Sequence, residues 1–206
     1  MKAYFIPTAK EAESIFPGCG LKPYKYGILT GEYNGIPLFV TGTTKTSSAF
    51  SSHVIISEFK VKKAILTGIC GAYRQSGLKV GDVVTVHRDF FADEGVFYSD
   101  RIENIHEMGF GFAKDGCSQF VPYAGLPIVN SNTVSYLDGE GDVSALLYAK
   151  YGAQTENMEG AAFGFVCNMM GIEASQVRAV SNFCGKRDSQ EWNVRLAFQN
   201  LKNLFE

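Results

Sequence analysis

Residues 156–182, with the sequence ENMEGAAFGFVCNMMGIEASQVRAVSN, decide the fold class of this chain. The segment from Glu156 to Met170 predicts a helix that is apolar on nearly all of its faces and is therefore buried. The segment 176–180 that follows predicts a strand whose apolar residues are continuous rather than alternating, as in strands covered on both faces. A buried helix leading into a buried strand is typical of an α/β fold.

The same alternation extends outward from this segment in both directions. Short apolar runs predict further strands at residues 3–6, 37–40, 64–67, 82–86 and 127–129. Helical spacing of apolar residues predicts helices over 46–59 and 142–151, and a surface helix over 194–205 that packs one apolar stripe on the core. We therefore expect one α/β domain over residues 1–206, with a central mixed, largely parallel β-sheet flanked by helices.

Composition excludes several classes of protein. The chain has 206 residues, of which 46% are hydrophobic and 19% charged, so it is globular rather than disordered. A formal charge of -2 with scattered basic residues argues against a nucleic-acid surface. The N-terminal apolar run is too short for a signal peptide, and no segment is apolar enough to span a membrane.

Cysteine and histidine usage indicates a reducing compartment and no metal. The five cysteines are odd in number and form no C-x-x-C pair, so we expect no disulfide framework and a cytoplasmic location. The three histidines have no ligand spacing with one another or with the cysteines, so we expect no zinc site.

Functional residues are expected just after the apolar runs, because ligands gather at the carboxyl ends of strands in such folds. Glu11 follows the first run and is either an exposed carboxylate at a helix start or a functional acid. The segment 67–72 follows the third run and is either an ordinary strand-to-helix turn or a place where backbone N–H groups approach a ligand.

The segment quoted above carries three more candidates. Glu159 lies in the first turn of the buried helix, where it either caps the helix or requires partners such as two vicinal sugar hydroxyls. Arg178 interrupts an apolar strand and requires a charged or multiply accepting partner. Asn182 ends that strand and offers both a donor and an acceptor.

Several motifs together resemble the nucleoside phosphorylase/nucleosidase superfamily, which includes the methylthioadenosine/S-adenosylhomocysteine nucleosidases. They are Thr67–Gly71 (TGICG), Leu78–Val84 (LKVGDVV), Asn157–Ala162 (NMEGAA) and Arg178–Asn182 (RAVSN). Within the superfamily, the sequence is most similar to the futalosine hydrolase family, through Glu156–Phe163 and through Ser181-Asn182 followed by Arg187-Asp188 and Trp192.

The resemblance implies a role for each matching position. Glu11 falls where nucleosidases keep the carboxylate that activates the attacking water. Met158 and Glu159 fall where the ribose is held, with the carboxylate bridging its 2′ and 3′ hydroxyls. Thr133 and Val134 fall near the segment that lines the purine.

The strand end falls where the leaving purine is recognised at its N7 edge, through Ser181 and Asn182. Adenine-specific relatives carry Asp at the position of Asn182, and an amide there favours a 6-oxopurine such as hypoxanthine. Those relatives also carry Ser-Ala where this chain has Ile69-Cys70, and the family usually has glycine where it has Thr44.

The resemblance thus implies hydrolysis of the N-glycosidic bond of a 5′-modified inosine such as futalosine, without cofactor or metal, by a homo-oligomer. An aromatic wall and a cation are expected for the carboxyphenyl chain beyond C5′. The candidates are Phe90-Phe91, Trp192 and Arg187, for which core packing and a plain surface charge remain the alternatives.

Three other functions stay open. An enzyme of the same fold could use phosphate instead of water, as purine nucleoside phosphorylases do. It could also be an adenine-specific methylthioadenosine/S-adenosylhomocysteine-type nucleosidase. A nucleoside-binding or structural protein that has lost catalysis is the third alternative, and the presence of both Glu11 and Glu159 argues against it.

Overall fold

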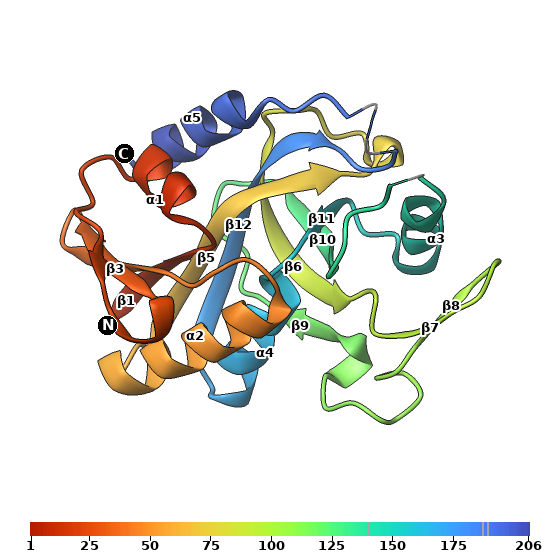
Figure 1. Ribbon diagram of the computed structural model, residues 1–206, viewed down its shortest axis with the longest axis horizontal. Coiled ribbons are helices and arrows are strands. Elements are labelled where there is room, and N and C mark those ends of the chain that lie inside the picture. The colour runs from red at the N-terminus through yellow and green to blue at the C-terminus, as the bar shows by residue number, and fades with distance from the viewer. Residues whose placement is uncertain (140, 187, 189) are drawn as a thin grey trace.

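The computed structural model describes residues 1–139, 141–186, 188 and 190–206, and it has three layers (Figure 1). One extended sheet lies between two layers of helices, and a small hairpin projects from one end. The main sheet contains β1 (Lys2–Ile6), β2 (Lys22–Pro23), β3 (Leu29–Tyr33), β4 (Ile36–Val40), β5 (Lys63–Ala72), β6 (Val83–Phe91), β9 (Cys117–Gln119), β10 (Ile128–Thr133), β11 (Thr155–Asn157) and β12 (Glu173–Phe183). The helices are α1 (Ala9–Ile15), α2 (Lys45–Phe59), α3 (Asp142–Tyr151), α4 (Gly160–Met169) and α5 (Val194–Phe205), and the hairpin is β7 (Gly95–Phe97) with β8 (Ile102–Asn104).

The sheet is mixed, as predicted. Its order is β11-β10-β6-β12-β5-β1-β4-β3-β2, with β9 paired to β6. The strands β4, β1, β5 and β12 pair in parallel, and so do β6, β10 and β11. Antiparallel pairings of β12 with β6 and of β11 with β5 join these two blocks. The five strands β5, β12, β6, β10 and β11 therefore form a closed ring of paired strands. This closure brings the short strand β11 beside the end of β5.

Alternating residues of β1 enter two separate cores, which is why the strand is apolar from Ala3 to Ile6. Phe5 packs on Phe163 of α4, with ring centroids 5.1 Å apart, in the core that also holds α2. Tyr4 packs on Phe205 of α5, at 5.3 Å, in the core that also holds α1. The predicted surface helix at the C-terminus is confirmed, since α5 buries its apolar stripe and caps one face of the sheet (Figure 1).

Two local predictions are wrong. The helix predicted from Glu156 begins at Gly160, because residues 155–157 form β11 and the Asn157 side chain then accepts the backbone N–H groups of Glu159 and Gly160 at 2.9 and 2.7 Å. The predicted turn at residues 67–72 is instead the second half of β5, which pairs with β12 and β11.

The five cysteines are all free and buried, as expected. None of the helices in the described part of the chain combines the length and apolar character needed to cross a bilayer.

Candidate active site

A cavity of about 280 Å³ opens at the carboxyl ends of the central strands. Its walls come from the β1–α1 turn, the end of β5, the β11–α4 segment, β12, and α5 with the residues before it. Its volume suits a small molecule rather than a polymer. Eight of the predicted site residues line it: Glu11, Ile69, Met158, Glu159, Arg178, Ser181, Asn182 and Trp192.

Glu11 lies in the first turn of α1 but is buried, with only 6% exposed, so the alternative of an exposed carboxylate is wrong. Thr8 is the N-cap of this helix, and its hydroxyl donates to Glu11 Oε2 at 2.7 Å. The backbone N–H of Ile69 donates to Oε1 at 3.1 Å. Burial raises the pKa of Glu11, and nearby Glu159 adds to the rise, while the hydrogen bonds from Thr8 and Ile69 oppose it. A held carboxyl with a raised pKa is suited to accept a proton.

Glu159 is the N-cap residue of α4, but its side chain caps nothing, so the capping alternative is wrong. It is 4% exposed, and its Oε2 accepts from Nη2 of Arg178 at 3.1 Å. The Asn157 side chain, rather than that of Glu159, accepts the N–H groups at the start of the helix. The rest of the Glu159 carboxylate therefore faces the cavity.

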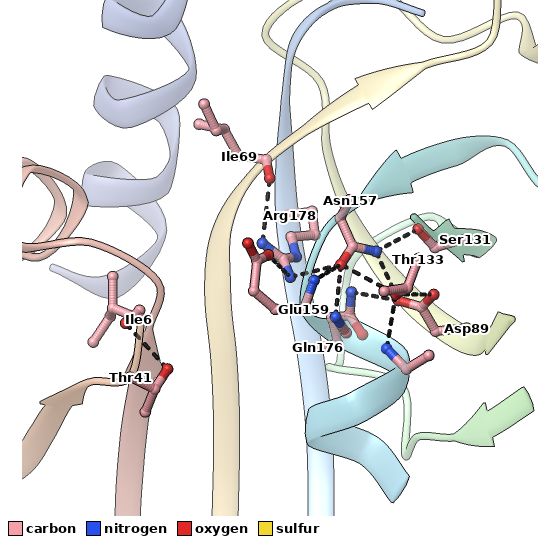
Figure 2. Close-up of polar contacts among 12 residues, drawn as sticks. Ile6, Thr41, Ile69, Asp89, Ser131, Thr133, Asn157, Glu159, Gln176 and Arg178 are labelled. Carbon is pink, nitrogen blue, oxygen red and sulfur yellow. Dashed lines mark hydrogen bonds and ion pairs between the residues drawn. The ribbon is translucent and has the colours of Figure 1, made fainter. Parts of the chain in front are cut away.

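Arg178 is fully buried and holds three groups in place (Figure 2). Besides Glu159, its guanidinium donates to Asn157 Oδ1 at 3.1 Å and to the Ile69 carbonyl at 3.2 Å. The expected charged partner of Arg178 is therefore Glu159. Removing either partner from such a buried pair leaves an uncompensated charge, which costs about 3–5 kcal/mol.

Behind Arg178 lies a buried carboxyl that the sequence reasoning missed. Asp89 of β6 is fully buried and accepts from Thr133, Asn157 and Gln176 at 2.7, 2.7 and 2.9 Å (Figure 2). Burial raises the pKa of Asp89, and these hydrogen bonds oppose the rise. Asn157 thus connects Asp89 to Arg178, and the network fixes the residues that hold Glu159. The available signal was the polar run His87-Arg88-Asp89 between the apolar residues of the strand 83–91.

Thr133 and Val134 lie behind the wall rather than on the cavity. The Thr133 hydroxyl bonds Asp89 and also accepts the N–H of Ala161 at 2.8 Å. Val134 is buried in an apolar cluster with Phe90. Phe90 and Phe91 are likewise buried in apolar clusters, whereas Trp192 does line the cavity. The predicted cation Arg187 lies outside the described residues.

The end of β12 changes register between Val180 and Asn182, a bulge of the kind that redirects side chains near functional sites. The Ser181 hydroxyl lies 2.8 Å from Asn182 Oδ1 and can donate to it. That contact presents the NH₂ group of the buried amide as its donor side, and the NH₂ group donates to the Phe183 carbonyl at 3.2 Å and to Gln190 Oε1 at 3.4 Å.

Gly68 is required where these groups meet. A Cβ atom there would lie 2.7 Å from Glu11 Oε1, 3.1 Å from Arg178 Nη1 and 3.2 Å from the Pro7 ring. Thr44, at the expected glycine position, has a φ of 91° and caps α2 through its side chain, which accepts from the N–H of Ser47. A positive φ explains why glycine suits that position.

Glu156 is a further carboxyl on the cavity wall to which the sequence reasoning gave no role. It is buried, and the Tyr73 hydroxyl donates to its Oε2 at 2.7 Å. Burial raises the pKa of Glu156 to about 7. Glu156 reaches the cavity wall because β11 pairs with β5, a pairing that the sequence does not show.

Within the described ranges, no cluster of three or more His, Cys, Asp or Glu residues is placed to hold a metal ion. The cavity offers three carboxyl groups, one buried guanidinium and two amides among its described lining residues.

Comparison with known proteins identifies the family of the chain. The family model described as "Phosphorylase superfamily" matches residues 13–206. A futalosine hydrolase of Thermus thermophilus is 28% identical over 181 residues, covering 81% of this chain and 78% of that protein. A futalosine hydrolase of Acidothermus cellulolyticus is 26% identical over 213 residues, covering 96% and 86%.

Solved structures share the fold. The native futalosine hydrolase of Helicobacter pylori superimposes with a TM-score of 0.78 at 16% identity, covering 99% of this chain and 94% of that one. The 5′-methylthioadenosine/S-adenosylhomocysteine nucleosidase of Neisseria meningitidis, in complex with methylthio-immucillin-A, gives 0.77 at 18% identity, covering 99% and 96%. At these identities the likeness shows the fold alone, so the chemistry must be argued from this chain's own residues.

Proposed function

Because the chain belongs to the phosphorylase superfamily, we propose that it is a nucleosidase that hydrolyses the N-glycosidic bond of futalosine and releases hypoxanthine. The observation that carries this proposal is that Glu11, Glu159 and Asn182, far apart in the chain, line one cavity. Each of the three has the chemistry that one part of the nucleoside requires.

Glu159 holds the ribose. Its carboxylate accepts hydrogen bonds from the 2′ and 3′ hydroxyls, beside the backbone of Met158, and places negative charge near the cationic anomeric carbon of the transition state. Arg178 holds the carboxylate from behind. The sugar hydroxyls supply the partners that a buried carboxylate requires.

Glu11 activates the water. As the bond from C1′ to the purine nitrogen breaks, a water oxygen bonds to C1′ and its proton passes to Glu11. General-base catalysis of this kind contributes about 10²–10⁴ in rate. The electron pair of the broken bond leaves with the purine, where the Asn182 amide donates to the developing negative charge. By analogy with oxyanion holes, one such donor contributes about 10²–10³.

Hydrolysis is favoured over the use of phosphate. A phosphate site needs several free cationic or multidentate donors. The only basic residues among the described lining residues are Lys10 and Arg178, and Arg178 is already paired with Glu159. Lys45, at the start of α2, could have supplied a further cation, but it pairs with Asp93 and Glu94 at 2.5 and 2.8 Å.

A 6-oxopurine is favoured over adenine, because Asn182 can donate to O6 or N7 but cannot protonate N7 as an acid would. The expected wider setting follows from the substrate. We propose a role in menaquinone biosynthesis, a homo-oligomer, and one nucleosidase domain over residues 1–206. A cytoplasmic location is supported by the five free cysteines.

The direct test is to incubate the protein with futalosine, inosine and methylthioadenosine, each with and without phosphate, and to separate free bases by chromatography. The proposal expects hypoxanthine from futalosine without phosphate. Release of adenine from methylthioadenosine as the faster reaction supports the adenine-specific alternative. Release that requires phosphate supports a phosphorylase.

A further inference from the structure

Glu156 and Asn182 lie on either side of the same glycine. Glu156 of β11 is in register with Gly71 of β5, and Asn182 of β12 is in register with the same residue from the opposite side. Two strand spacings separate them, about 10 Å between Cα atoms. Gly71 has no side chain, and Cys184 occupies the space beside it, since a Cβ atom at Gly71 would lie 2.6 Å from Cys184 Sγ and 3.6 Å from Asn182 Nδ2. Glu156, Gly71 and Asn182 all line the cavity, so the carboxyl and the amide can contact two ends of one planar group bound there.

One oxygen of the Glu156 carboxyl, Oε2, already accepts a hydrogen bond within the protein. Asn132 donates through Nδ2 to the Tyr73 hydroxyl oxygen at 3.0 Å, and the Tyr73 proton is therefore directed at Glu156 Oε2. Within the described residues, the other donor to Glu156 is the Cys184 thiol, a weak donor, so the carboxyl keeps lone pairs that can accept from a ligand at the cavity wall.

The groups that face Glu156 supply no cation in the part of the chain that the structure describes. They are Tyr73 at the end of β5, Cys184 after β12, Asp138 in the loop before α3 and Asp93 after β6. Burial, together with the two aspartates, raises the pKa of Glu156 to about 7, against the hydrogen bonds from Tyr73 and Cys184. A buried carboxylate without a cationic partner is stabilised by a further hydrogen-bond donor, which a ligand in the cavity can supply.

A 6-oxopurine carries the matching groups along one edge. Its N7 and O6 accept, and its N1–H donates, in that order. The Asn182 amide can donate to N7 or O6, and a carboxylate on the far side can accept N1–H. Adenine presents an acceptor at N1 instead and would leave the carboxylate facing a lone pair, which costs far more than a missing contact.

We propose that Glu156 is a specificity residue that accepts the N1–H of a 6-oxopurine while Asn182 donates to the other end of the same edge. This inference rests on the proposed function for the identity of the ligand. It goes beyond that function by assigning base selection to a residue outside the hydrolytic pair.

The test measures binding of free bases by titration calorimetry, so it does not depend on catalysis. Wild-type protein, Glu156→Gln and the exposed control Glu13→Gln are titrated with hypoxanthine, 1-methylhypoxanthine and adenine. At about pH 8, Glu156→Gln is expected to weaken hypoxanthine binding about tenfold through loss of a charge-assisted hydrogen bond, and Glu13→Gln to leave it unchanged. Wild-type protein should bind 1-methylhypoxanthine at least tenfold more weakly than hypoxanthine.

The pH dependence separates this role from a merely structural one. Because the charged carboxylate accepts N1–H more strongly than the neutral acid does, hypoxanthine binding by the wild type should weaken about tenfold from about pH 8 to about pH 6, and adenine binding should not. Tyr73→Phe removes a hydrogen bond that favours the carboxylate, so it should move the midpoint of this change to higher pH. If Glu156→Gln does not fold, that shift still decides the matter.

The inference is overturned if the affinity for hypoxanthine is unchanged both by pH and by Glu156→Gln. It is also overturned if that affinity increases as the pH falls. The two proposals fail separately. Selective hypoxanthine binding without futalosine hydrolysis would support the role of Glu156 and refute the proposed function. Futalosine hydrolysis with unaltered base selection in Glu156→Gln would support the proposed function and refute the role of Glu156.

Discussion

Gly68→Ala should damage the site without removing any of its functional groups. The added Cβ atom would lie 2.7 Å from Glu11 Oε1, at least 0.7 Å closer than the 3.4–4 Å of an ordinary van der Waals contact. The Pro7 ring at 3.2 Å and the buried Arg178 at 3.1 Å leave little room on the other sides. The Glu11 carboxylate must therefore move away from the Ile69 N–H that holds it.

A displacement of this size is large for a general base. Misplacement of a reacting group by about 1 Å can cost about 10²-fold in rate, so we expect kcat/KM for futalosine to fall about 100-fold. Overpacking should also cost about 1–3 kcal/mol of unfolding free energy. The assay is hypoxanthine release by chromatography, with a urea unfolding curve to confirm that the variant is folded under assay conditions.

Gly139→Ala is the matched control, because a Cβ atom there meets nothing within 4 Å and its φ is not in the left-handed region. It should retain wild-type activity and stability. A Gly68→Ala protein that keeps kcat/KM within threefold of wild type would refute the placement of Glu11 in the reaction.

Three further predictions concern individual side chains. Glu11→Gln should lower kcat by about 10²–10⁴ with little change in KM. In the same steady-state assay, Glu13→Gln on the exposed side of the same helix should behave as wild type. Equal kcat for Glu11→Gln and wild type would show that Glu11 is not the base. Asn182→Asp should shift the ratio of kcat/KM values for futalosine and its 6-amino analogue toward the 6-amino substrate, and an unchanged ratio would separate Asn182 from base recognition. Burial raises the pKa of Glu156 from 4.5 to about 7, so the wild type loses about 3 kcal/mol of stability as the pH rises from below 4.5 to above 7, while Glu156→Gln does not. Urea unfolding of both proteins at several pH values measures this difference, and parallel stability curves would show that the carboxyl is not buried as described.

The layered fold was predictable because its signal is local. Continuous apolar runs such as residues 64–67 predict strands covered on both faces, and the structure places β5 between two helical layers. The helix over residues 142–151 was predicted with its observed bounds. The start of α4 was not, because the Asn157 side chain ends β11 and caps the helix, and such a contact has no periodicity.

The acids of the site were predictable for a different reason. Glu159 stands at the start of an otherwise apolar helix, so its burial and its need for partners follow from its neighbours. Asp89 was missed because its partners are distant in the chain, Gln176 lying 87 residues away. Glu156 was missed because only the closure of β11 on β5 brings it to the wall. The same closure sets Thr133 behind the wall, bonded to Asp89.

A crystal structure of the Glu11→Gln variant with futalosine bound would test the assigned roles of these residues at once. We expect the Glu159 carboxylate on the 2′ and 3′ hydroxyls, the substituted position 11 facing C1′, and the purine edge between Asn182 and Glu156. A nucleoside bound in another cavity, or bound here with its ribose away from Glu159, would contradict these roles.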